Sequence, residues 1–161
     1  MDIRVAPLAD ILRLNTVLFR NCLDELTDEQ AARRPSDATN SAAFIAAHLA
    51  SSRFYLLKAL GVDEKDPLAP YLDGRKGIDD IERLPPLREV EAAWTRGAHL
   101  LRDRLEALTA ADIDAPSSVA FPLANGALLG TLTFLVQHDS YHLGQLSLLR
   151  KYCGLPAMRY R

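Results

Sequence analysis

The sequence predicts an all-α fold, a four-helix bundle with long connections between some of its helices. Apolar residues recur at helical spacing in four stretches, and strand-like alternation is nearly absent. A connection of roughly 25 residues, rich in proline and glycine, follows the second stretch; it is too long for a tight helical hairpin and indicates a crossover. At 161 residues the chain is about one domain long, so we expect a single domain over residues 1–161.

The first predicted helix covers about residues 7–26 and begins with a proline, which suits a first helical turn. A capping box from Thr27 to Gln30 predicts a short helix or turn directly after it. The apolar face that this first helix would turn toward the core consists of Leu8, Ile11, Leu12, Leu18, Phe19, Cys22 and Leu23.

The other three predicted helices end near residues that are typical of helix termini. The second begins at residue 40 or 41 and ends at 60, before Gly61, which suits a C-cap. The third covers about residues 87–108. The fourth covers about residues 128–152 and ends before Gly154.

Composition excludes several classes of protein. The net charge of -2 gives no sign of binding to nucleic acid or to an anionic membrane. No apolar run approaches the roughly 20 residues needed to cross a bilayer, and the first ten residues lack the apolar stretch of a signal peptide. Cys22 and Cys153 fit neither a disulfide framework nor a CxxC metal site. We therefore expect a cytoplasmic protein.

Three of the four histidines point inward when each helix is drawn at about 100° per residue. His138 and His142 lie about 40° apart on the apolar face of the fourth helix, and His48 lies on the apolar face of the second. His99 lies nearly opposite the apolar face of the third helix, so we expect it to be exposed.

The inward histidines allow two interpretations. In one, each ring nitrogen is hydrogen-bonded within the core; in the other, the three rings share a metal ion. A lone inward histidine is usually a core residue bonded to a carbonyl oxygen, and an HxxxH pair often arises by chance. Three inward histidines without an obvious run of polar partners are harder to accommodate, because each buried nitrogen needs a partner. A shared cation accepts one nitrogen from each ring, which favours a metal site at His48, His138 and His142.

Two segments carry a resemblance to a known family. A single histidine late in "NSAAFIAAHLASSRFYLLKALG" is followed near the C-terminus by "QHDSYHLGQLSLLRKYCGLP". This arrangement, above all the HxxxHxGQ pattern, resembles the DinB/YfiT-like superfamily over nearly the whole chain. The resemblance implies an up-down-down-up bundle, frequent homodimers, and a divalent metal bound by His48, His138 and His142.

The resemblance also implies an activity. Relatives with a known reaction include thiol-dependent enzymes that use low-molecular-weight thiols, such as maleylpyruvate isomerase and bacillithiol transferases. Some relatives have a further histidine just before the last ligand. Here that position is Tyr141, so the role of that residue does not carry over.

Three neutral imidazoles would leave a zinc ion at least one open position, the pattern of a catalytic site. Nickel, copper or iron also accept nitrogen ligands, and zinc or nickel are the ions we expect. Such an ion lowers the pKa of a bound water or thiol. Candidates for orienting a water or a substrate are Gln145, Asn15 and Tyr55, although each could be an ordinary buried polar group. Asp139 is predicted to be lateral or solvated, which leaves no inward carboxylate as a general base.

These observations favour a metal-dependent enzyme, a hydrolase or thiol S-transferase acting on a small electrophile. The alternatives are a metal-binding or stress-related bundle without catalysis, and a structural helical dimer with satisfied histidines. We also expect a homodimer, because the fourth helix has a second apolar strip that would otherwise face water; the strip could instead pack against the long connections. Its residues are Leu132, Val136 and Leu143.

Overall fold

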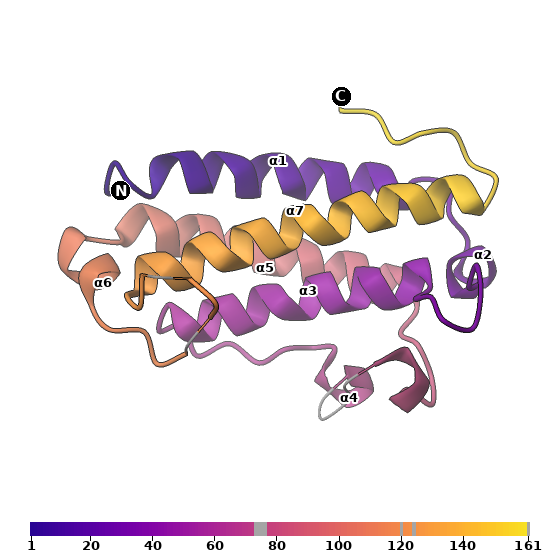
Figure 1. The fold of residues 1–161 in the computed structure, drawn as a ribbon, viewed down its shortest axis with the longest axis horizontal. Helices are drawn as coiled ribbons and strands as arrows, with labels where there is room; N and C mark the ends of the chain where they lie inside the picture. The colour runs from indigo at the N-terminus through magenta and orange to yellow at the C-terminus, as the bar shows by residue number, and fades with distance from the viewer. Residues whose placement is uncertain (73–76, 120, 124, 161) are drawn as a thin grey trace.

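A computed structural model describes residues 1–72, 77–119, 121–123 and 125–160 of the chain. Four long helices lie side by side along the molecule (Figure 1). Helices α1 and α7 run in one direction and helices α3 and α5 in the other, which corresponds to an up-down-down-up order. The predicted all-α fold is confirmed. The long helices are α1 (Ala6–Leu23), α3 (Ala42–Ala59), α5 (Leu87–Ala107) and α7 (Leu128–Tyr152).

Short helices occupy the connections. The segment between α3 and α5 leads the chain from one end of the bundle back to the other, so that α5 starts where α3 started (Figure 1); residues 73–76 of this crossover lie outside the described part. The first long helix ends three residues before its predicted end, and Glu25 in the following turn has a left-handed φ of 62°. The short elements are α2 (Asp28–Ala32), α4 (Ala69–Leu72), η1 (Ile78–Asp80) and α6 (Ala110–Asp114).

Capping residues explain where α2 and α3 begin and where α3 ends. The hydroxyl oxygen of Ser41 accepts a hydrogen bond from the backbone N–H of Phe44 at 3.2 Å, which caps α3. Gly61 has a φ of 80°, a conformation that glycine adopts without strain, and it closes the same helix. The predicted capping box of Thr27 and Gln30 is present at the start of α2.

Helix α7 lies between α1 and α3 and packs against both of them. This arrangement corrects two predictions. The apolar strip of Leu132, Val136 and Leu143 does not face outward; all three side chains are buried within the protein. Ile11 was predicted to face the core from α1, but it is 40% exposed, because the buried face of α1 is centred on Leu12, Asn15 and Phe19, about 40–100° further around the helix.

Strand structure is reduced to one contact in the part of the chain that the structure describes. This contact is an isolated antiparallel bridge between Pro116 and Ala127, just before α7. Within the same residues, none of the helices combines the length and the apolar composition that crossing a bilayer requires.

Candidate metal centre

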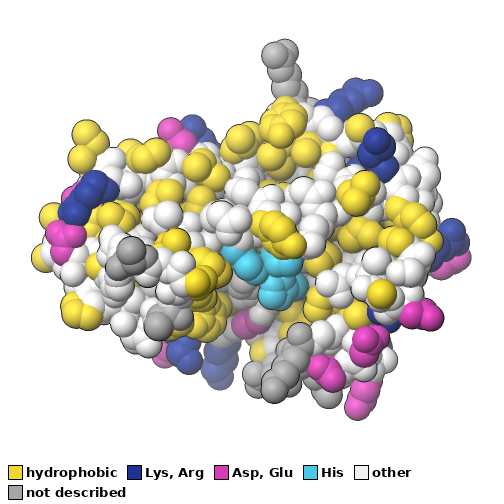
Figure 2. Space-filling view, viewed as in Figure 1, with side chains coloured by type: hydrophobic (Ala, Val, Ile, Leu, Met, Phe, Trp, Pro, Cys, Tyr) yellow, Lys and Arg dark blue, Asp and Glu magenta, His cyan; other side chains and the backbone are white. Residues whose placement is uncertain are grey.

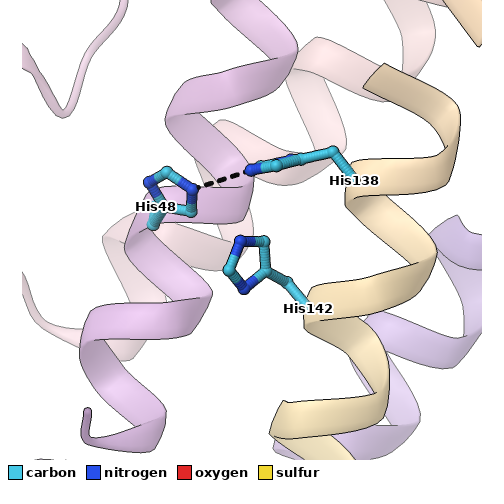
Figure 3. A group of neighbouring side chains, drawn as sticks. All are labelled: His48, His138 and His142. Atoms are coloured by element: carbon cyan, nitrogen blue, oxygen red, sulfur yellow. Dashed lines mark hydrogen bonds between the residues drawn. The ribbon is translucent and has the colours of Figure 1, made fainter. Parts of the chain in front are cut away.

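The bundle brings His48, His138 and His142 together on the seam between α3 and α7 (Figure 3). His138 and His142 lie one turn apart on α7, and His48 faces both of them from α3. The ring centroids are 5.0 Å apart for His48 and His138, 4.9 Å for His48 and His142, and 4.4 Å for His138 and His142. One ring nitrogen from each histidine lies within 4.8 Å of the others, so the cluster could hold a metal ion.

The orientation of the rings suits a shared ion. The Nε2 atoms of His48 and His138 are 3.0 Å apart, and one nitrogen of His142 faces the same space (Figure 3). Two imidazole nitrogens bound to one zinc ion at about 2.0–2.1 Å, at an angle between right-angled and tetrahedral, lie about 2.9–3.4 Å apart. Without a cation, one of these two Nε2 atoms must carry a hydrogen and donate it to the other.

Gln145 determines which nitrogen His142 presents to the cluster. The Nδ1 atom of His142 lies 2.6 Å from the Gln145 Oε1 atom, and the Gln145 side-chain amide donates to the Tyr141 hydroxyl at 3.2 Å. Because an amide oxygen only accepts hydrogen bonds, His142 donates through Nδ1, and its Nε2 lone pair remains available. Acceptors that fix the tautomer in this way accompany metal-binding histidines.

His138 lacks the equivalent partner. Its Nδ1 atom is buried and has no hydrogen-bond partner in the described part of the chain, while its Nε2 atom faces His48. Burial, together with the neighbouring His142, lowers the pKa of both His48 and His138 to about 4. Burial also lowers the pKa of His142, and all three rings are therefore neutral at neutral pH, the form that binds metal ions.

The cluster reaches the surface instead of being enclosed. All three histidines are half-buried, and Figure 2 shows their side chains at the surface in the middle of one face. A hollow of about 290 Å³ opens beside His48 and His138. The other residues that line it are Ser51, Ser52, Tyr55, Phe121, Phe134 and Leu135.

Asp139, the residue after His138, corrects the prediction of a lateral or solvated side chain. It is only 3% exposed and forms an ion pair at 3.3 Å with Arg53 of α3, which is 1% exposed. The position about 100° from His138 faces the bundle interior because α1 and α3 flank α7 on both sides. Burial raises the pKa of the Asp139 carboxyl to about 6, while the adjacent Arg53 opposes that rise. This inward carboxylate is committed to an ion pair.

Arg53 is the buried functional group that sequence reasoning missed. Its guanidinium lies 3.2 Å from the centre of the Trp94 ring and donates to the Thr16 hydroxyl at 2.9 Å. A signal was present, because the positions three and four residues away on the same helix are apolar and buried: Leu49, Ala50, Leu56 and Leu57. A charged residue at the centre of such a face indicates a buried partner.

The remaining predicted site residues lie in different places. Tyr55 is 45% exposed, yet it lines the hollow beside His48. Asn15 is buried and donates to the Ser140 hydroxyl at 3.0 Å, which joins α1 to the side of α7 about 200° from His138. Asn15 therefore lies apart from the cluster. His99 is exposed, as its helical phase predicted.

The fold and the histidine cluster define a helical bundle with a candidate three-histidine metal centre. A sequence profile for the DinB superfamily matches residues 11–146, and the chain belongs to that family. No curated protein matches the sequence at a significant level.

Two solved structures share the fold. A DinB-like protein from Bacillus cereus ATCC 10987 superposes with a TM-score of 0.74 at 17% sequence identity, over 96% of this chain and 96% of that chain. A DinB-like protein from Bacillus subtilis, YjoA, superposes with a TM-score of 0.63 at 13% identity, over 98% of this chain and 96% of that chain. At these identities the similarity establishes the architecture, and the chemistry must be argued from the site.

Proposed function

We propose that the protein binds one divalent metal ion through His48, His138 and His142 and uses it in a metal-dependent reaction on a small molecule. The observation that carries the proposal is the convergence of the three rings, with ligand atoms within 4.8 Å of one another and the His48 and His138 Nε2 atoms 3.0 Å apart. Three nitrogen ligands suit zinc or nickel, which are the ions we propose.

The surroundings of the cluster support a reaction more than a purely structural ion. Structural zinc sites are usually closed by four protein ligands, whereas three ligands leave a position open. Here the described part of the chain supplies three histidines, and the hollow beside them leads to solvent. When bound, the ion would supply Lewis acidity toward a substrate oxygen or sulfur.

Other residues near the cluster would orient a metal ligand and bind the substrate. Gln145 orients His142, and the hollow receives the substrate. Asp139 is held by Arg53, so this carboxylate does not serve as a general base. The reaction classes that need no strong protein base here are hydrolysis and transfer of a low-molecular-weight thiol to an electrophile, and we propose one of these two.

The first experiment measures metal content. Tag-free protein is stripped with a chelator, loaded with Zn²⁺ or Ni²⁺, dialysed and subjected to elemental analysis. We expect one ion per chain, loss of the ion in His48→Ala, His138→Ala and His142→Ala, and retention in His99→Ala, whose side chain is exposed elsewhere. Circular dichroism verifies that each variant is folded. Wild-type protein that retains neither metal would contradict the proposal.

The second experiment separates the reactions. A panel of small electrophiles is offered with water, glutathione, bacillithiol or mycothiol as the acceptor, with and without chelator. Turnover should disappear with the ion and return when it is restored. Full turnover by metal-free protein would contradict the metal mechanism, and no turnover with any acceptor would favour the non-catalytic metal-binding bundle.

We further propose that two chains associate through the outer face of α1 and α7. The strip of Leu132, Val136 and Leu143 is buried and cannot form this contact. Other apolar side chains are exposed on the same two helices, and no charged side chain lies in the middle of this face above the histidines (Figure 2). They are Ile11, Leu14 and Val17 on α1 and Tyr141, Leu148 and Tyr152 on α7.

A further inference from the structure

The hollow beside the histidines has an aromatic wall. Phe121, from the connection before α7, stacks on Phe134 of α7 with ring centroids 4.2 Å apart and planes at 13°. The edge of the Tyr55 ring meets Phe121 at 6.5 Å and 77°. These three rings come from α3, α7 and the connection between α6 and α7, so the packing of the bundle brings them together. A planar ring entering the hollow would find faces and edges with which it can stack.

The two serines that line the hollow present hydrogen-bond acceptors to it. The Ser51 hydroxyl donates to the Asp66 carboxylate, and the Ser52 hydroxyl donates to the backbone carbonyl oxygens of His48 and Leu49 at 3.0 Å. Since each hydroxyl has one hydrogen, both serine oxygens have only lone pairs left for a ligand. The complementary group on a ligand is therefore an O–H or N–H donor.

The hollow also lacks charge. Among the described residues that line it, none carries a carboxylate, an ammonium or a guanidinium group. In the metal-free protein, a charged group that enters such a space loses hydration without gaining a partner of opposite charge. The volume of about 290 Å³ lies just below the range of about 300–1,000 Å³ that is usual for ligand pockets. These properties select for one ring and a short uncharged substituent.

We propose that the substrate of this site is a small uncharged aromatic molecule, whose ring packs against Phe121 and Phe134 and whose donor group meets Ser51 or Ser52. The part of this inference that places the reacting group at the histidines rests on the proposed metal-dependent function. The volume of about 290 Å³ is small for a tripeptide such as glutathione, so we assign the hollow to the electrophile and not to the thiol.

The test uses three probes with metal-free protein and follows side-chain and backbone resonances by NMR. Benzyl alcohol is uncharged and aromatic, cyclohexylmethanol has a similar size but a saturated ring, and benzoate adds a charge. We expect benzyl alcohol to bind about 2–10-fold more tightly than cyclohexylmethanol, the advantage that aromatic contacts provide. Benzoate should bind more weakly than benzyl alcohol. The shifts should concentrate on Tyr55, Phe121 and Phe134.

Two variants test the aromatic wall. Phe121→Leu keeps an apolar side chain but removes the ring, and it should reduce the preference for benzyl alcohol to near parity with cyclohexylmethanol. Leu123→Ala is the matched control, because this exposed side chain lies in the same connection and outside the hollow, and it should leave the preference unchanged. Phe134→Leu replaces Phe121→Leu if circular dichroism shows that the first variant is unfolded.

The same titrations with zinc-loaded protein separate the two proposals. If the protein prefers benzyl alcohol but cannot be loaded with zinc, the result would support the ligand class and contradict the metal function. Equal affinity for benzyl alcohol and cyclohexylmethanol, shifts centred away from the three rings, or no binding of any probe would overturn the inference, whether or not the protein binds metal.

Discussion

Arg53 of α3 and Asp139 of α7 form an ion pair inside the bundle, directly beside the histidine cluster. Their closest atoms are 3.3 Å apart, and both side chains are almost fully buried. Asp139 follows His138 in the sequence, while Arg53 lies five residues after His48. The pair therefore joins the two helices that carry the three histidines, and it contributes to their register.

Removing one member of this pair should destabilise the protein strongly. Asp139→Ala leaves the Arg53 guanidinium buried without its counter-ion, which costs about 3–5 kcal/mol of the free energy of unfolding. The paired change Arg53→Met with Asp139→Leu should recover most of that loss, because no charge remains buried. Urea unfolding of metal-free protein, followed by circular dichroism, measures both variants.

Asp103→Ala is the control for this experiment. Asp103 pairs with Arg102 on the surface, where both side chains are exposed, and its removal should change the free energy of unfolding by less than about 1 kcal/mol. A similar loss in Asp103→Ala and Asp139→Ala would show that the buried pair has no special role.

Gln145 should affect metal affinity without acting as a ligand. Gln145→Ala removes the acceptor for the His142 Nδ1–H group, and the affinity for zinc should fall by about 10–100-fold. Gln145→Glu keeps an acceptor at this position and should preserve tight binding. Competition with a chromogenic chelator measures the dissociation constants. Gln137→Ala, an exposed glutamine on the same helix, should bind zinc as the wild type does, and an unchanged affinity in Gln145→Ala would refute the orienting role.

The stability of metal-free protein should decrease in mildly acidic solution. Burial lowers the pKa of His48 and His138 to about 4 in the folded state, below the value of about 6.5 in an unfolded chain. The unfolded state therefore binds more protons between these values, so stability is complete above about pH 6.5 and is lost as the pH falls toward 4. The raised pKa of Asp139 acts in the opposite direction below about pH 6, but it is one group against two histidines, so urea unfolding at pH 7.5, 5.5 and 4.5 should still show a decline.

Substitution of the histidines identifies the source of the pH dependence. His138→Gln should flatten the decline between pH 6.5 and 4, whereas His99→Gln, at an exposed position, should leave it unchanged. The same slope in His138→Gln and wild-type protein would assign the effect to other groups.

The proposed dimer should depend on the outer face of α7. Light scattering at micromolar concentration should give twice the 17.8 kDa mass of one chain. Leu148→Glu places a charge on a side chain that is 68% exposed on this face, and it should yield folded monomers. Ile3→Glu, at an exposed position near the N-terminus, should remain dimeric. A wild-type mass of 17.8 kDa would refute the dimer.

Helical phase alone predicted which histidines face inward, but not how deeply they are buried. Phase placed His48, His138 and His142 on inward faces and His99 outside, and these placements agree with the structure. Phase could not distinguish the centre of the core from its edge. The three histidines lie on the seam between α3 and α7, where they are half-buried and reach solvent.

Asp139 shows the opposite case. On a helix drawn alone, a carboxylate about 100° away from the apolar histidine face looks lateral, and nothing along the chain pairs it with a residue 86 positions earlier. The ion pair with Arg53 exists because α7 packs between α1 and α3, which encloses two of its sides. The same packing buries Leu132, Val136 and Leu143.

By itself the sequence determined the four long helices, most of their ends and the residues that could bind a metal, because apolar periodicity, Ser41, Gly61 and the capping box at Thr27 act through local backbone geometry. Only the tertiary structure decided which inward faces meet. Contacts such as His48 with His138, Arg53 with Asp139 and Phe121 with Phe134 depend on how helices pack across the bundle. That packing is settled by the fit of all the apolar faces together, which no single stretch of sequence contains.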